Sequence, residues 1–105
     1  MEQSIPLSQK FNLLKMVVDE SHIHLIMDKI LKEIKNNHQQ NIDRYNKDLK
    51  YFESKYEMDS NLFYEKFEKG QLGDEMDYFE WSGLIELRNE LFDKVKILET
   101  NNECT

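Results

Sequence analysis

Residues 52–87 read FESKYEMDSNLFYEKFEKGQLGDEMDYFEWSGLIEL, and this stretch decides the fold because it holds all three glycines and the only tryptophan. Its order predicts a long helix that ends near Tyr56, followed by a short helix over 59–69. Asp59 is a favourable N-cap for the short helix, and Gly70 suits the left-handed residue that ends a helix. The short helix would therefore close the end of a helical hairpin.

A final helix is predicted from Asp74 to Leu98. Asp74 is a favourable N-cap, and Glu75 and Asp77 fall in the first turn, where the helix dipole favours carboxylates. Arg88 would lie on the apolar face of this helix and pair with an acid of another helix or of a partner. The large side chains that recur at helical spacing and form this broad face are Phe79, Trp81, Leu84, Ile85, Leu91, Phe92, Val95 and Leu98.

Residues 8–35 predict one or two further helices and a candidate dimer surface. Ser8 can cap a short helix on which Phe11, Leu14 and Val18 share one face, and residues 19–21 supply a break. Residues 16–27 also alternate in a way that suits a β-hairpin, but Asp-Glu-Ser is a weak turn sequence without glycine. We prefer two helices joined by a turn.

Residues 23–56 follow a helical pattern throughout. Apolar positions fall at steps of three or four, and Ile42, Leu49 and Tyr56 are seven apart, as in the seam of a coiled coil. The polar run NNHQQN at residues 36–41 is a poor helix former. One long helix and two shorter helices therefore both stay open.

These elements together predict an all-α fold in one domain over residues 1–105. Residues 1–37 would form an N-terminal helical part. Residues 38–100 would form a long antiparallel helical hairpin with an acidic C-terminal half. Residues 101–105 would form a disordered tail.

The net charge of −7 is spread unevenly along the chain. Residues 1–27 carry −1, residues 28–55 carry +2 and residues 56–105 carry −8. An acidic half repels nucleic-acid phosphates and attracts basic proteins, although it also suits a surface that only prevents aggregation. No apolar run reaches the roughly 20 residues of a membrane span. With Cys104 as the single cysteine, no intrachain disulfide can form, and we expect a cytoplasmic protein.

Residue types that carry chemistry do not group in a recognised way. His22 and His24 are two residues apart and point away from each other on a helix. The dense acids from Asp74 to Glu80 lack the ligand order of a calcium loop, and helix capping explains most of them. No glycine-rich phosphate loop or nucleophile elbow occurs. We therefore expect no enzyme activity, no metal site and no cofactor.

Aromatic side chains and acids gather late in the sequence. Most aromatic stripes at helical spacing belong to a core, but Tyr78, Phe79 and Trp81 lie too close together for all three to face inward. Those at the surface would anchor an interface. The predicted partner-binding residues are Glu68, Asp74, Asp77, Glu80 and Trp81.

Within the quoted stretch, the order F-E-x-K-Y-x-M-x-S-x-x-F-Y-x-K-F-E-x-G-x-L-G-D-x-x-D-x-F-E-W runs from Phe52 to Trp81. It resembles a block found in small acidic antitoxin-like proteins of prokaryotic toxin–antitoxin pairs. Leu62 stands where the block often has Glu, so the reciprocal half of a capping box is missing. Residues 1–40 lie outside the resemblance. The resemblance implies a protein that binds a small toxin.

We therefore expect a protein-binding module that neutralises a small basic toxin, one that targets RNA. The acidic C-terminal half would occupy the phosphate-binding surface of that toxin. A structural or adaptor homodimer is one alternative. A DNA-binding regulator that uses the N-terminal helices is another, although acids alternate with the seven bases of residues 29–55 and favour a solvated helix face. We expect no membrane partner, and homo-oligomers stay open.

Overall fold

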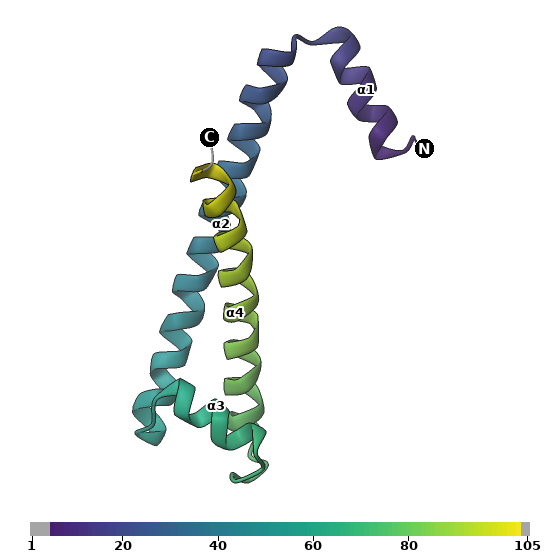
Figure 1. The fold of residues 1–105 in the computed structure, drawn as a ribbon. Helices are drawn as coiled ribbons and strands as arrows, with labels where there is room; N and C mark the ends of the chain where they lie inside the picture. Colours follow the sequence, from purple (N-terminus) through teal and green to yellow (C-terminus); the bar gives the residue numbers. More distant parts are fainter. Residues whose placement is uncertain (1–4, 104–105) are drawn as a thin grey trace. The chain divides into compact units, whose positions relative to one another are not determined.

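The computed structural model describes residues 5–103, which form four helices (Figure 1). The helices are α1 (Leu7–Val17), α2 (Glu20–Tyr56), α3 (Ser60–Glu68) and α4 (Met76–Glu103). The described residues contain no strand, so the all-α prediction is confirmed and the alternative of a β-hairpin over residues 16–27 is wrong. No helix among them is long and apolar enough to cross a bilayer.

The chain divides between Ile34 and Lys35 into two compact units. The N-terminal unit contains α1 and the first part of α2. The C-terminal unit contains the rest of α2 together with α3 and α4. From the sequence we expected the N-terminal helical part to end at residue 37, inside a single domain. The number of domains stays a prediction.

Helix α1 begins two residues earlier than the sequence predicted. Pro6 takes the N-cap position in extended conformation, with φ −63° and ψ 157°, and its carbonyl accepts hydrogen bonds from the amides of Gln9 and Lys10. Proline suits a helix start because its φ is already fixed and no amide is lost. The predicted cap, Ser8, therefore lies inside the helix. The break that follows is at Val18, which is extended.

Helix α2 is continuous over 37 residues, which resolves the question left by the polar run at residues 36–41. Side chains of this run bond locally along the helix, with Gln39 donating to Asp43 at 3.4 Å and Arg44 donating to Asn41 at 2.6 Å. Ile42, just after the run, is 1% exposed and anchors the helix in the C-terminal unit. Packing has overridden weak helix propensity here.

The corner between α2 and α3 is closed by a carboxylate from α2. Glu57 ends α2 in the left-handed region at φ 51°, and Asp59 then takes the predicted N-cap position of α3. The Asp59 side chain makes no capping hydrogen bond. Instead, the amide of Ser60 donates to Oε2 of Glu53 at 3.0 Å. A side chain seven residues upstream thus satisfies the helix start.

The loop between α3 and α4 follows the prediction in part. Gly70 has φ 71°, as expected for the residue that ends α3, and the amide of Gln71 returns to the carbonyl of Lys66 at 3.0 Å. Helix α4 begins at Met76, and the carbonyl of Glu75 accepts hydrogen bonds from the amides of Tyr78 and Phe79. Glu75 therefore replaces Asp74 as the cap residue.

Helix α4 runs to Glu103, beyond the predicted end at Leu98. Residues 101–103 of the predicted tail are therefore helical, whereas 104–105, including Cys104, lie outside the described residues.

In the C-terminal unit, α4 runs antiparallel to α2 and α3 lies across the end of the pair (Figure 1). Lys35 pairs with Glu99 at 3.4 Å near one end, and Lys55 pairs with Asp77 at 2.7 Å near the other. The predicted helical hairpin is confirmed. Its core is a cluster in which all three helices take part: Leu49, Phe52, Phe63, Trp81 and Ile85.

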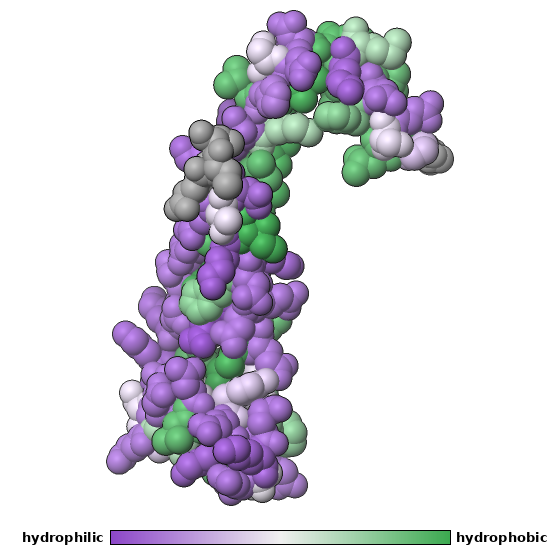
Figure 2. Space-filling model, viewed as in Figure 1, coloured by the Kyte–Doolittle hydropathy of each residue, from purple (hydrophilic) through white to green (hydrophobic). Residues whose placement is uncertain are grey.

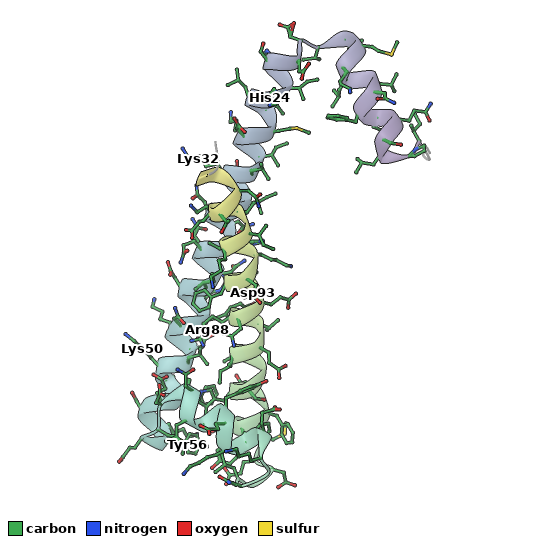
Figure 3. The ribbon with its side chains drawn as sticks, viewed as in Figure 1. His24, Lys32, Lys50, Tyr56, Arg88 and Asp93 are labelled. Atoms are coloured by element: carbon green, nitrogen blue, oxygen red, sulfur yellow. The ribbon has the colours of Figure 1, made fainter. Side chains whose placement is uncertain are left out.

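Arg88 lies between α2 and α4 (Figure 3). Its Nη1 donates to Oδ1 of Asn46 at 3.3 Å, and its guanidinium lies 5.4 Å from the ring centre of Phe92. The predicted acidic partner within the fold is therefore wrong, because a neutral amide of α2 occupies that position.

Candidate protein-binding surface

The five residues predicted to bind a partner fall in two adjacent segments of the C-terminal unit. Glu68 is the last residue of α3, and Asp74 lies in the loop that follows. Asp77, Glu80 and Trp81 belong to the first two turns of α4. The structure separates these five residues into three different environments.

Trp81 is part of the core and offers no surface to a partner. It is fully buried, its ring stacks on Phe63 with centroids 3.9 Å apart, and its Nε1 donates to Oγ of Ser60 at 2.9 Å. The exposed aromatic of this segment is Phe79, at 54%. Because α3 packs on the side of α4 that carries position 81, the expected contact role of Trp81 is corrected to a structural one.

Asp77 is engaged by the fold on one of its oxygens. Its Oδ2 accepts from Nζ of Lys55 at 2.7 Å and from the hydroxyl of Tyr56 at 2.6 Å. The hydrogen bond from Lys55, followed by the one from Tyr56, holds the pKa of the Asp77 carboxyl below its usual value. The same carboxylate raises the pKa of Tyr56 to about 12. The Asp77 charge therefore mainly stabilises the junction of α2 and α4.

Three predicted residues remain exposed and unengaged. Glu68, Asp74 and Glu80 have solvent-exposed side chains, and none of them pairs with a base among the described residues. Glu75, between them in sequence, is also exposed. Residues 57–80 hold eight acids and two bases, a net charge of −6. We call the four exposed carboxylates Glu68, Asp74, Glu75 and Glu80 the acidic end.

A shallow hollow of about 310 Å³ lies at the edge of the acidic end. Asp48, Asp77 and Glu80 line it together with the rings of Tyr51 and Phe52. Carboxylates beside an aromatic face suit a cationic side chain, because both attract positive charge. Nζ of the protein's own Lys55 already bonds Asp77 and lies 5.9 Å from the centre of the Tyr51 ring.

Sequence reasoning missed Asp48 and Tyr51 as parts of this surface. Tyr51 is 60% exposed, and both residues lie on α2, about 30 residues before the acids of α4. Their spacing along α2 gave only a weak signal. The antiparallel pairing of α2 and α4 is what brings them to the same edge.

Other chemistry is sparse on the described residues. No group of three or more histidine, cysteine or acidic side chains among them could hold a metal ion. A second, open hollow between α2 and α4 carries side chains of both charges, including Asp93, Lys96 and Glu99.

Comparison with known proteins gives no relative on which to base a function: no family model, curated protein or solved structure matches this chain.

Proposed function

We propose that this chain is a protein-binding module that acts in the manner of an antitoxin, neutralising a small basic partner through the acidic end of its C-terminal unit. The observation that carries the proposal is the exposure of Glu68, Asp74 and Glu80 without a pairing base among the described residues. Unpaired surface carboxylates are free to pair with lysines and arginines of another protein. Their common field also speeds the approach of such a protein.

The hollow beside the acidic end supports the same reading at the level of one side chain. Lys55 is a primary ammonium held between the Asp77 carboxylate and the rings of Tyr51 and Tyr56, at 5.9 and 5.5 Å from their centres. A lysine or arginine of the partner would find the same chemistry, with Asp48 and Glu80 to complete its neutralisation.

A protein that acts on nucleic acid uses its basic surface to bind the substrate, so a chain that covers this surface neutralises the protein. Such a surface binds phosphates through lysine and arginine, and its affinity falls when those charges are already paired. A chain that covers it with carboxylates competes directly with RNA. The proposal requires no catalytic group on this chain, only a matching charge pattern.

The test is recovery and inhibition of the partner by matched variants. The immobilised wild-type chain should capture a small basic protein from host lysate, and one equivalent of the chain should suppress that protein's RNA-directed activity. The variant E68Q/D74N/E80Q should bind it about tenfold more weakly, because three exposed ion pairs contribute about 0.5 kcal/mol each. The loss should shrink as salt is added.

The matched control removes three charges elsewhere, in D43N/E90Q/D93N. These residues are also exposed and lie outside the acidic end, so the control should bind like the wild-type chain. Equal weakening by both variants would show that net charge alone matters. Capture of no basic protein at all would refute the proposed function.

A further inference from the structure

The N-terminal unit carries an unusual amount of exposed apolar surface. Thirteen of the twenty exposed large apolar side chains among the described residues lie between Ile5 and Ile34, although this segment is less than a third of the chain. Figure 2 shows these hydrophobic residues gathered over α1 and the first part of α2. Nothing in the C-terminal unit is comparable, since its large apolar groups are mostly buried or half-buried.

Five of the six exposed large apolar side chains in the first part of α2 lie on one helix face, and only Leu25 points elsewhere. Met27, Ile30 and Ile34 are spaced by three and four residues and are 39% to 52% exposed. Ile26 and Leu31 flank them at 45% and 48%. We call these five residues the N-terminal stripe.

The N-terminal stripe continues the face that the C-terminal unit buries. Further along the same face of α2, Ile42, Leu49 and Phe52 are 1%, 2% and 4% exposed. There α3 and α4 cover the helix. One helix face therefore has a packed segment and a half-exposed one, and the half-exposed segment has the composition of a core. Ile23, at the N-terminal end of this face, is again buried at 6%.

The uncovered area is large enough for a stable association. The exposed fractions of the thirteen side chains amount to about seven fully exposed ones, on the order of 1,000 Å². A standard protein interface buries roughly 800 Å² on each partner, and the largest apolar patch of a typical monomer covers about 300–600 Å². Summed over α1 and the first part of α2, the exposed apolar surface is therefore of the size that one side of a standard interface buries.

We propose that a second copy of this chain covers the N-terminal stripe, so that two N-terminal units pack against each other as a homodimer. Residues 1–34 hold four bases and five acids, so this unit neither repels a copy strongly nor selects a charged partner. Beside the stripe, Lys29 and Glu33 are four residues apart and carry opposite charges, which lets two copies pair opposite charges across a twofold axis.

The spacing of the stripe also suits a helix of the same kind. Met27 and Ile34 are seven residues apart with Ile30 between them, which is the repeat of a seam between two long helices. Phe11 and Leu14 of α1 are 37% and 46% exposed and would join the interface. Two α1–α2 pairs would then form a four-helix arrangement around one apolar centre. This inference does not rest on the proposed function.

Sedimentation of the full chain between about 1 and 100 µM tests the proposal. The wild-type chain should have the mass of two 12.7 kDa chains, and the variant I30E/I34E should have the mass of one. The matched control is I97E, which changes an isoleucine that is 61% exposed on α4 and should leave the dimer intact. Circular dichroism should show that the helix content of all three proteins is retained.

Three outcomes would overturn the inference. They are a wild-type chain that stays monomeric at 100 µM, a dimer that survives in I30E/I34E, and a dimer lost equally in I97E. Binding of a monomeric wild-type chain to vesicles of neutral and anionic lipid would assign the stripe to a membrane surface instead. If I30E/I34E still captures the basic partner, the loss of the dimer is independent of the proposed function.

Discussion

The same face of helix α2 is buried in the C-terminal unit and exposed in the N-terminal unit. Between Ile42 and Phe52 it is sealed by α3 and α4, and between Met27 and Ile34 it faces solvent. The sequence pattern is the same in both segments, so the pattern alone does not determine burial. The contrast teaches that α2 has a core-forming face along most of its length and that the described residues cover only part of it.

The largest expected effect is on the sealed side. Trp81→Ala removes the ring that stacks on Phe63 and leaves a cavity among α2, α3 and α4, so it should cost about 3–5 kcal/mol of unfolding free energy. Thermal and urea unfolding followed by circular dichroism measure it. On the open side, Ile30→Ala should change the unfolding of the C-terminal unit by less than about 0.5 kcal/mol. Similar losses of unfolding free energy in both variants would show that the two segments of α2 do not differ.

A smaller effect is expected at the polar contact inside the sealed core. Ser60 is 3% exposed, and Ser60→Ala leaves the Trp81 Nε1–H without its acceptor, which should cost about 1–3 kcal/mol. Ser82→Ala is the control, because Ser82 only donates to the carbonyl of Phe79 within α4. Urea unfolding should rank Ser60→Ala as clearly worse. If the two variants were equal, the buried hydrogen bond would contribute nothing specific.

Two glycines of the C-terminal unit should respond in opposite directions. A Cβ at Gly70 or at Gly83 would meet no atom within 4 Å, so only backbone conformation matters. Gly70 has φ 71°, and Gly70→Ala should destabilise by about 1 kcal/mol. Gly83 lies inside α4, and Gly83→Ala should stabilise by about 0.5–1 kcal/mol. Midpoints of urea unfolding measure both, and shifts of the same sign would contradict the assigned conformations.

The smallest effect is a change in titration at the junction of α2 and α4. The carboxylate of Asp77 raises the pKa of Tyr56 to about 12 from 10.0, so the stabilisation is complete below pH 10 and is lost as pH rises through about 12. The pKa of Asp77 is lowered, so its contribution is present above its ordinary value of 3.8 and is lost on further acidification.

Absorbance of the phenolate measures this link. Asp77→Asn should move the Tyr56 step from about pH 12 toward 10. The step of Tyr64, whose pKa is raised to about 12 by Glu86, should stay in place and serves as the internal control. An unchanged absorbance titration in Asp77→Asn would mean that the hydrogen bond to Tyr56 is not maintained in solution.

Local sequence signals were enough for the helices and the hairpin of the C-terminal unit. The left-handed Gly70 and the cap position of Asp59 are decided by a few neighbouring residues, so the sequence predicts them directly. The antiparallel pairing of α2 with α4 follows from two apolar faces joined by a short helix. Helix start and stop signals carry most of this information.

Features that depend on packing between residues far apart in the chain could not be predicted from the sequence. Which of Phe79 and Trp81 faces inward depends on how α4 is rotated against α3, and the sequence fixes no such rotation. Glu53 caps α3 from seven residues away, and Asn46 takes the place expected for an acid beside Arg88. Of the predicted site, Glu68, Asp74 and Glu80 remain exposed, whereas Trp81 is buried and Asp77 is largely engaged by the fold.

The burial of the only tryptophan has a practical consequence. Trp81 touches α3 through Phe63 and α2 through Phe52, so its indole emission reports on the meeting of three helices at once. Because no second tryptophan contributes, a stopped-flow fluorescence trace of refolding would time the docking of α3 without any added label. The chain therefore carries an intrinsic fluorescent probe of the packing of α3 against α2 and α4.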